Sequence, residues 1–439
     1  MMKKWVSVAL VFTMALSLLM GCGRKDSNSD AEQSASETKE LESSGGYESD
    51  EQIVLECIQW KYEAAPGFEA WAEAFNEKYP NITVEFSGAD NYKENVMGRI
   101  AANNAPALIA VPGGKYGFDL AKSGHLMDLS DSELVPRLKE ELVEAQKYDG
   151  KLYTLPIDVA AQGVIYNREV FEKFELEIPQ TWDEFIAVCE ELKANDVVPV
   201  VVSGKDEWTL AIAGTTYASF IYGANPNFDM DVIEGNETYV NDSWRKVMED
   251  YTTIRDNYAN EDFTSLDYSL ANQMIANGEA AMTIQGIWAA AAIQEYNPEV
   301  DLGFFRLPNE DTEENKCLIW GPDFTMGISA TTEYKEECLL FLDFITSEEG
   351  ARIWTEKVQT FSAVKGSDME FNQIAVDING ILNTGIKTYP LVNHEWFMDN
   401  VWTDWGKTIQ QYNNGEVELD YPLEFLEKAV KEAYAIYSN

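Results

Sequence analysis

The sequence is poor in positive charge and in histidine. It contains 32 lysines and arginines against 76 aspartates and glutamates, which gives a formal net charge of −44, and its two histidines are His125 and His394. Because nucleic-acid binding requires clustered lysine and arginine, this balance argues against a nucleic-acid partner. With two histidines and no cysteines in CxxC spacing, we expect neither a metal site nor a cofactor.

Cysteine is scarce as well, with five in 439 residues. Cys22 lies at the end of the N-terminal hydrophobic run. The other four, which lie in segments with the pattern of regular core elements, are Cys57, Cys189, Cys317 and Cys338. An exported protein can form disulfides, but this placement favours free, buried thiols.

Long hydrophobic runs are missing except at the N-terminus. Lys3 and Lys4 precede an apolar run, Val6–Met20, of about 15 residues, which is short for a membrane span and typical of a secretory signal peptide. The run ends in Leu-Met-Gly before Cys22, which resembles a bacterial lipobox. We therefore expect residues 1–21 to be a lipoprotein signal peptide and Cys22 to be the site of lipid attachment. The alternative is an ordinary signal peptide followed by an incidental cysteine.

Residues 24–52 are rich in serine and glutamate and almost free of apolar side chains. Such a segment cannot bury enough surface to order itself, so we expect residues 22–52 to form a disordered tether. The predicted location is the cell membrane, lipid-anchored, on its extracytoplasmic face.

The rest of the chain, which is 45% hydrophobic over the full length, begins with alternating strand and helix patterns. Apolar runs at 53–60, 82–86 and 108–111 predict strands, and helical spacing at 68–79 and 95–103 predicts helices between them. This order is typical of a parallel sheet with helices on its faces, so the fold class is α/β. Further segments predicted as strands are 197–202, 280–285 and 324–329, and further helices are 182–193, 287–296, 333–346 and one opening at Asp420.

Tryptophan is the most informative residue type, with 12 in the sequence. In α/β sheets, ligands bind beyond the carboxyl ends of the strands, where a flat indole suits the C–H face of a pyranose. The tryptophans that we predict at strand ends or in loops are Trp60, Trp208, Trp288, Trp320, Trp396, Trp402 and Trp405. Core packing is the alternative for all of them, and it is the preferred interpretation for Trp71, Trp182, Trp244 and Trp354, which lie on helix faces.

Carboxylates near these positions could accept hydrogen bonds from sugar hydroxyls. Asp158 and Asp323 stand beside strand entries, after Pro156 and Pro322, and Glu63 follows Trp60. For each, the alternative is a solvated carboxylate or a helix or turn cap.

Several segments in order resemble the family 1 extracellular solute-binding proteins of bacterial ABC importers, in the sugar-binding branch that includes maltose-binding protein. The matching segments are FEAWAEAFNEKYPNITVEF (68–86), SGHLMDL (123–129), DGKLYTLPIDVAAQGVIYNREVF (149–171), IPQTWDEFIAVCEELK (178–193), NGEAAMTIQGIWA (277–289), GPDFTMGIS (321–329) and ECLLFLDFITSEEGARIW (337–354).

The resemblance implies a periplasmic-binding-protein-like fold, with two α/β lobes, a ligand cleft and a multi-crossing hinge. The crossings are expected near 158–164, 324–330 and 362–372. Lobe one would comprise 53–160 with 328–366, and lobe two 165–323 with 372–439. Trp288 matches the family's sugar-stacking tryptophan, and Trp208 and Trp396 match aromatic wall positions more loosely.

The chain also departs from the family's maltodextrin binders. Those proteins carry a tryptophan and an aspartate after the third strand, where this sequence has Pro112 and Lys115. The position of their carboxylate in the first crossing is occupied here by Ala160. The sequence therefore does not identify which glycan is bound. The function implied is a lipoprotein that captures a sugar or oligosaccharide and delivers it to the permease subunits of an ABC transporter, as a monomer.

Two other functions compete with this one. The acidity and the tryptophans also suit a polyamine or other cationic solute on the same fold, because aromatic boxes bind cations. A surface glycoside hydrolase would need paired carboxylates, which 76 acidic residues supply by chance. Since GxSxG, HExxH and phosphate-loop motifs are missing from the sequence, we expect a binding protein and not an enzyme.

Overall fold

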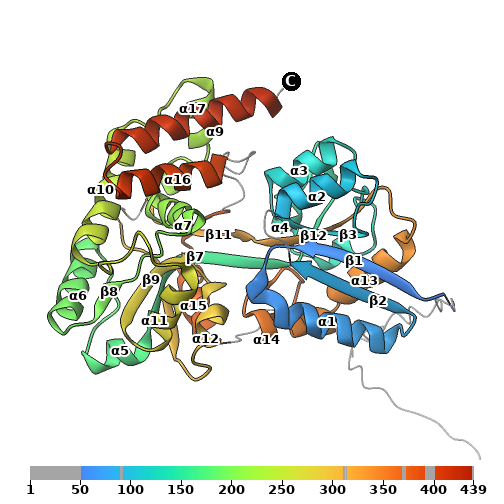
Figure 1. The fold of residues 1–439 in the computed structure, drawn as a ribbon, viewed down its shortest axis with the longest axis horizontal. Helices are drawn as coiled ribbons and strands as arrows, with labels where there is room; N and C mark the ends of the chain where they lie inside the picture. Colours follow the sequence, from blue (N-terminus) through green and yellow to red (C-terminus); the bar gives the residue numbers. More distant parts are fainter. Residues whose placement is uncertain are drawn as a thin grey trace, which may run out of the picture. The chain divides into compact units, whose positions relative to one another are not determined.

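The computed structural model describes residues 51–88, 92–309, 312, 314–367, 372–390 and 401–437. Its strands form two main sheets, and helices pack around each of them (Figure 1). We call each sheet with its helices a lobe. The exact limits of the lobes stay a prediction.

The first sheet has the strand order β2-β1-β3-β12-β6. Its strands are β1 (Ile53–Gln59), β2 (Ile82–Gly88), β3 (Leu108–Pro112), β6 (Leu155–Pro156) and β12 (Phe324–Ile328). The first three are parallel, and β12 runs antiparallel to β3 and β6. The helices of this lobe are α1 (Ala65–Lys78), α2 (Tyr92–Ala101), α3 (Lys115–Lys122), α4 (Glu140–Glu144), α13 (Lys335–Ile345) and α14 (Glu348–Val358). Short elements are η1 (Tyr62–Ala64), η2 (Val135–Arg137), β4 (Lys147–Tyr148) and β5 (Lys151–Leu152).

The second sheet has the order β14-β11-β7-β9-β8, and β10 and β13 also pair with β7. Its strands are β7 (Asp158–Asn167), β8 (Val198–Val200), β9 (Ala280–Gly286), β10 (Leu302–Phe305), β11 (Cys317–Pro322), β13 (Phe361–Ser362) and β14 (Lys387–Tyr389). All ten residues of β7 are buried, as expected for a central strand with both faces covered. The helices of this lobe are α5 (Arg168–Lys173), α6 (Trp182–Ala194), α7 (Glu207–Tyr217), α8 (Ser219–Ala224), α9 (Phe228–Glu234), α10 (Asp242–Asn257), α11 (Tyr268–Ala276), α12 (Ala289–Gln294), α15 (Gln373–Leu382), α16 (Val401–Asn413) and α17 (Asp420–Tyr437).

The chain crosses between the sheets where strands of one continue into strands of the other. β6 continues into β7 at Ile157. β11 continues into β12 (Figure 1), with Asp323 between the two strands. A third crossing lies between α14 and α15, where β13 pairs with the start of β7. Because β12 pairs within the first sheet, the second crossing lies just before the 324–330 segment in which we predicted it.

Local sequence signals place many of the elements correctly. The predicted helix at 182–193 is α6, which opens with a capping box of Thr181 and Glu184, and α1 ends at Lys78, shortly before Pro80. The prediction of a loop or strand end was wrong for three tryptophans, which lie in two helices. Trp208 lies in the first turn of α7, and Trp402 and Trp405 lie in α16.

Aromatic side chains form much of the core. The Trp71 and Trp354 rings stack with centroids 4.2 Å apart and join α1 to α14, and Trp244 is buried in the second lobe. These three tryptophans are core residues as expected, while Trp182 is partly buried against the second-lobe core. Cys57, Cys189, Cys317 and Cys338 are free and buried, which confirms the preferred interpretation. Among the described residues, no helix is both long enough and apolar enough to cross a bilayer.

Candidate functional site

The carboxyl ends of parallel strands in both sheets point to the crossings. In the first sheet, the end of β3 at Pro112 lies opposite Phe324, where the second crossing enters the sheet. In the second sheet, β8 and β9 are parallel, and Gly286 at the end of β9 lies opposite Gln162, near the first crossing. Residues that follow these strands therefore gather where α/β proteins bind ligands.

A charged cluster occupies this place. The Lys61 ammonium lies 3.4 Å from Asp158 Oδ2 and also forms an ion pair with Asp323. The side chains of Lys61 and Asp158 are 1% and 0% exposed, whereas Asp323 is 20% exposed. Glu63 is half-buried and close enough to interact electrostatically with all three.

Burial and mutual charge shift the pKa values of this cluster in different directions. Burial alone would lower the pKa of Lys61, but the carboxylates of Asp158 and Asp323 raise it above its ordinary value, so the ammonium stays charged. Burial raises the pKa of Asp158, against the opposing effect of Lys61. Burial also raises the pKa of Glu63, again opposed by Lys61. Two carboxylates thus share the Lys61 ammonium, and a third, Glu63, lies within electrostatic range.

Two of the predicted aromatic residues, Trp60 and Trp320, lie close to the crossings. Trp60 follows β1 and is half-buried against Tyr92 and Phe324, with ring centroids 5.3 and 5.8 Å away. Trp320 in β11 meets the Phe361 ring edge-on at 4.9 Å. The first lobe and the second crossing therefore each contribute an indole with exposed surface.

Trp288 lies at the start of α12 and is 7% exposed. Its ring covers Gly286, and a Cβ at position 286 would overlap the indole, so the glycine of the QGIW segment lets the ring fold back over the end of β9. Trp208 in α7 meets the Tyr268 ring edge-on, with centroids 4.8 Å apart.

Residues 61–352 match the sequence pattern of the family described as bacterial extracellular solute-binding protein. The chain belongs to this family. A relative named "Multiple sugar-binding protein", from Streptococcus mutans, is 23% identical over 333 residues, which cover 72% of this chain and 76% of the relative. Another, the melibiose/raffinose/stachyose-binding protein MelE of Bacillus subtilis, is 25% identical over 306 residues, which cover 66% and 68%.

Solved structures agree with this solute-binding protein in fold. RafE in complex with raffinose aligns with a TM-score of 0.72 at 20% identity, covering 87% of this chain and 99% of RafE. A chitin oligosaccharide binding protein aligns with a TM-score of 0.74 at 20% identity, covering 87% of this chain and all of that one. The two-lobed α/β fold expected from the sequence is thereby confirmed.

The structure of the solute-binding protein brings some predicted residues together and leaves others apart. Asp158 and Asp323 meet at Lys61. Glu63 lies within electrostatic range of these three and of Tyr268, the neighbour of Trp208. Asp158 is internal, because both of its oxygens accept hydrogen bonds from the chain. Trp396, like the lipid-attachment residue Cys22, lies outside the described residues.

Two residues of the cluster were not predicted. Lys61 has the appearance of an ordinary surface lysine between Trp60 and Glu63, and its sequence context gives no sign that it is buried. Tyr268 is the first residue of α11, whose N-cap Asp267 accepts a hydrogen bond from the Leu270 amide. This aspartate cap was an available signal for the helix.

The Tyr268 hydroxyl is buried and makes no hydrogen bond within the described part of the chain, although Asn272 lies close enough to lower its pKa. Burial and the nearby charge of Glu63 raise the pKa of Tyr268 overall, so the phenol stays protonated. It can therefore donate a hydrogen bond to a group placed between it and Glu63.

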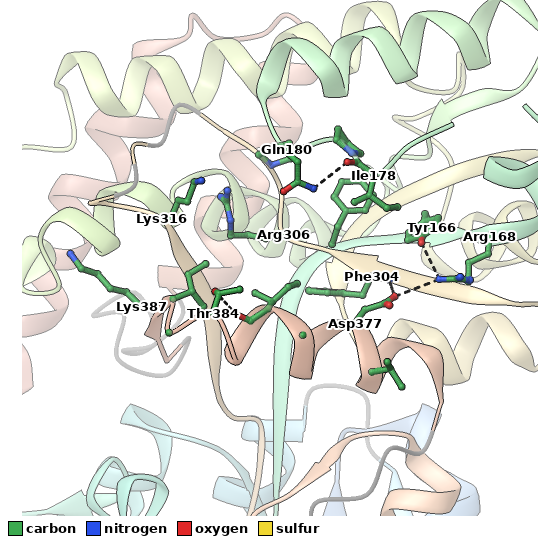
Figure 2. Close-up of a pocket in the computed structure, with 18 of the residues that line it drawn as sticks. Tyr166, Arg168, Ile178, Gln180, Phe304, Arg306, Lys316, Asp377, Thr384 and Lys387 are labelled. Carbon is green, nitrogen blue, oxygen red and sulfur yellow. Dashed lines mark hydrogen bonds and ion pairs between the residues drawn. The ribbon is translucent and has the colours of Figure 1, made fainter. Parts of the chain in front are cut away.

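A large cavity of the second lobe lies elsewhere (Figure 2). It has a volume of about 1090 Å³ and is formed by the ends of β7 and β10, by α15 and by the segment before α6. Arg168 lines this cavity and lies near Asp377, and we assign it no role at the crossings. None of the predicted ligand-binding residues is among its described lining residues. The candidate site is therefore the cluster at the crossings.

Proposed function

We propose that this solute-binding protein captures a sugar or oligosaccharide between its two lobes and delivers it to the permease of an ABC transporter. The observation that carries the proposal is that Trp60, which packs against Phe324, and Trp320 in β11 keep exposed indole surface close to the second crossing, where the carboxylate of Asp323 is partly exposed. Indole faces suit the C–H faces of pyranoses, and carboxylates accept hydrogen bonds from hydroxyl groups. The names of the relatives and structural neighbours, which include sugar-binding proteins, support the same class of solute.

The mechanism we propose is binding without chemistry. A solute first contacts the aromatic side chains of one lobe, and the other lobe then closes over it. Closure requires only that the solute bind the closed form more tightly than the open one. Because the relatives are named as binding proteins, we do not assign an enzymatic activity to the carboxylates.

We further propose that the protein is a monomeric lipoprotein, held to the extracytoplasmic face of the membrane through Cys22 and the tether of residues 22–52. The lipobox-like segment before Cys22 supports this proposal. In cells that express the full-length chain, Cys22→Ser should move the protein from the detergent-soluble membrane fraction to the soluble fraction. Retention of the variant in the membrane fraction would exclude lipid attachment at Cys22.

One observation favours a second candidate, a polyamine or other cationic solute. Asp158 and Asp323 contact Lys61 and Glu63 lies within electrostatic range, so the cluster has three acidic side chains and one basic one. A solute ammonium could balance the excess and lie against Trp208 or Tyr268, whose rings attract cations.

A thermal-shift screen of the full-length protein in detergent distinguishes the two candidates. The probes are raffinose, stachyose, chitin oligosaccharides and spermidine. A ligand at 100 times its Kd stabilises the folded protein by about 2.7 kcal/mol, which raises Tm measurably. A rise with a sugar supports the first function, and a rise with spermidine alone supports the second. If none of the probes raises Tm, both proposals are contradicted for these solute classes.

A further inference from the structure

Asp158 connects three segments that are distant in sequence. It is the first residue of β7, at the first crossing, and its Oδ1 accepts a hydrogen bond from the Phe324 amide at 2.8 Å, at the second crossing. Its Oδ2 accepts hydrogen bonds from Trp354 Nε1 at 2.9 Å and from the Thr360 hydroxyl at 3.0 Å. Trp354 lies in α14 and Thr360 at the third crossing, so a single buried carboxylate contacts all three crossings.

The backbone joins the same segments. The Ile157 amide donates to the Phe324 carbonyl at 3.0 Å, and the Ile157 carbonyl accepts from the Ala363 amide at 3.0 Å. The Asp323 amide also donates to the Asp158 carbonyl, at 3.3 Å. We call this hydrogen-bonded set (Ile157, Asp158, Asp323, Phe324, Thr360 and Ala363) the crossing junction. A change of backbone angle in one crossing therefore strains the other two.

Lys61 connects the crossing junction to the first lobe. It follows β1 and directly precedes η1, and its side chain is 1% exposed. A buried ammonium that lost its partners would carry a large desolvation penalty, so Lys61 is held between Asp158 and Asp323. Asp323 is the member of this ion-paired set with solvent-accessible side-chain surface, at 20%. A solute that approaches the set can therefore reach Asp323 before the other two.

We infer that Lys61 is a positioning residue, which ties the partly exposed side-chain carboxylate of Asp323 to the buried carboxylate of Asp158, so that a solute bonded to Asp323 acts on the hydrogen bonds that Asp158 makes within the crossing junction. This inference rests on the proposed function, because it assumes a solute between the lobes. It assigns Lys61 no contact of its own with the solute.

The first test needs no solute. Amide hydrogen exchange is measured by mass spectrometry on the full-length protein, for wild type, Lys61→Met and the control Lys151→Met, whose ion pair with Asp128 lies on the surface. In Lys61→Met, peptides that contain Asp323, Phe324 and Ala363 should exchange faster together, by about tenfold or more. The control should match wild type. Faster exchange confined to the peptide around residue 61 would overturn the inference.

The second test follows the coupling to binding, with raffinose as the probe. Asp323→Asn, which keeps the shape of the side chain, Lys61→Met and the double variant are compared by calorimetry. If Lys61 acts through Asp323, the double variant should lose no more affinity than Asp323→Asn alone. Additive losses would assign Lys61 a direct contact and overturn its role as a positioning residue. Failure of raffinose to bind wild type would count against the proposed function, while the exchange experiment still decides whether the junction depends on Lys61.

Discussion

Replacing Lys61 by methionine should cost far more stability than replacing an exposed lysine. The variant keeps an unbranched side chain, one heavy atom shorter, but leaves Asp158, which is 0% exposed, without its opposite charge. Breaking a buried ion pair by removing one partner typically costs about 3–5 kcal/mol. Lys151→Met removes a pair with Asp128 whose members are 56% and 39% exposed, and such surface pairs contribute about 1 kcal/mol or less.

Urea unfolding at pH 7, monitored by tryptophan fluorescence, measures the loss of unfolding free energy in both variants of the full-length chain. A loss for Lys61→Met no greater than that for Lys151→Met would refute the view that Lys61 compensates a buried charge. A second variant, Lys61→Met with Asp158→Asn, should recover part of the stability, because the unpaired buried charge is gone while the amide keeps an oxygen that can accept hydrogen bonds.

The pH dependence of this loss has a definite sign. An acid whose folded-state pKa is raised above its unfolded value costs stability at high pH, and the cost disappears as pH falls below the unfolded value, which is 3.8 for aspartate. Without Lys61, the pKa of Asp158 should lie higher than in wild type. The difference in stability between Lys61→Met and wild type should therefore be largest at pH 7 and narrow toward pH 4. A difference that widens on acidification would contradict the argument.

Three further predictions concern the site and its support. Because the pKa of Glu63 is raised, Glu63→Gln should raise the urea midpoint at pH 7, and the gain should vanish below its ordinary pKa of 4.5. Trp288→Ala should weaken binding of the sugar identified in the screen by about tenfold or more, measured by calorimetry, and unchanged affinity would remove Trp288 from the site. Gly214→Ala should destabilise α7 by about 1–3 kcal/mol, because its Cβ would overlap the Trp405 ring. Gly98→Ala, in α2 with no atom within 4 Å of the added Cβ, should stabilise by up to about 1 kcal/mol, and equal effects of the two would refute the packing argument.

The parts of the fold that were predictable depend on local signals. The apolar run of β1 and the Thr181–Glu184 capping box specify their elements within a few residues of sequence. Helix α16 was missed because its formation depends on distant contacts. Trp405 in that helix packs against Gly214 of α7 and donates a hydrogen bond to the Pro422 carbonyl. The segment also carries helical spacing, because Val401, Trp405 and Ile409 recur every four residues and are buried, and this signal was available in the sequence.

The candidate site was predictable in composition but not in arrangement. The sequence identified Asp158 and Asp323 as candidate ligand-binding acids from their place beside strand entries. It could not identify Lys61, whose partners lie 97 and 262 positions away in the chain. A lysine that neutralises buried carboxylates looks like a surface lysine until the fold brings the three residues together, because Lys and Asp are mostly exposed residue types.

The crossing junction also limits how the lobes can move. If each crossing bent independently, closure would break the hydrogen bonds through which Ile157 joins Phe324 and Ala363, and it would expose the Asp158 carboxylate. Each buried bond lost in this way costs about 1–3 kcal/mol, because a polar group is left unsatisfied. A movement in which the three crossings turn together keeps these bonds. We therefore expect opening and closing to be a rotation about the crossing junction, with the Asp323 carboxylate at its solvent-facing side, where a bound solute has the shortest path to influence it.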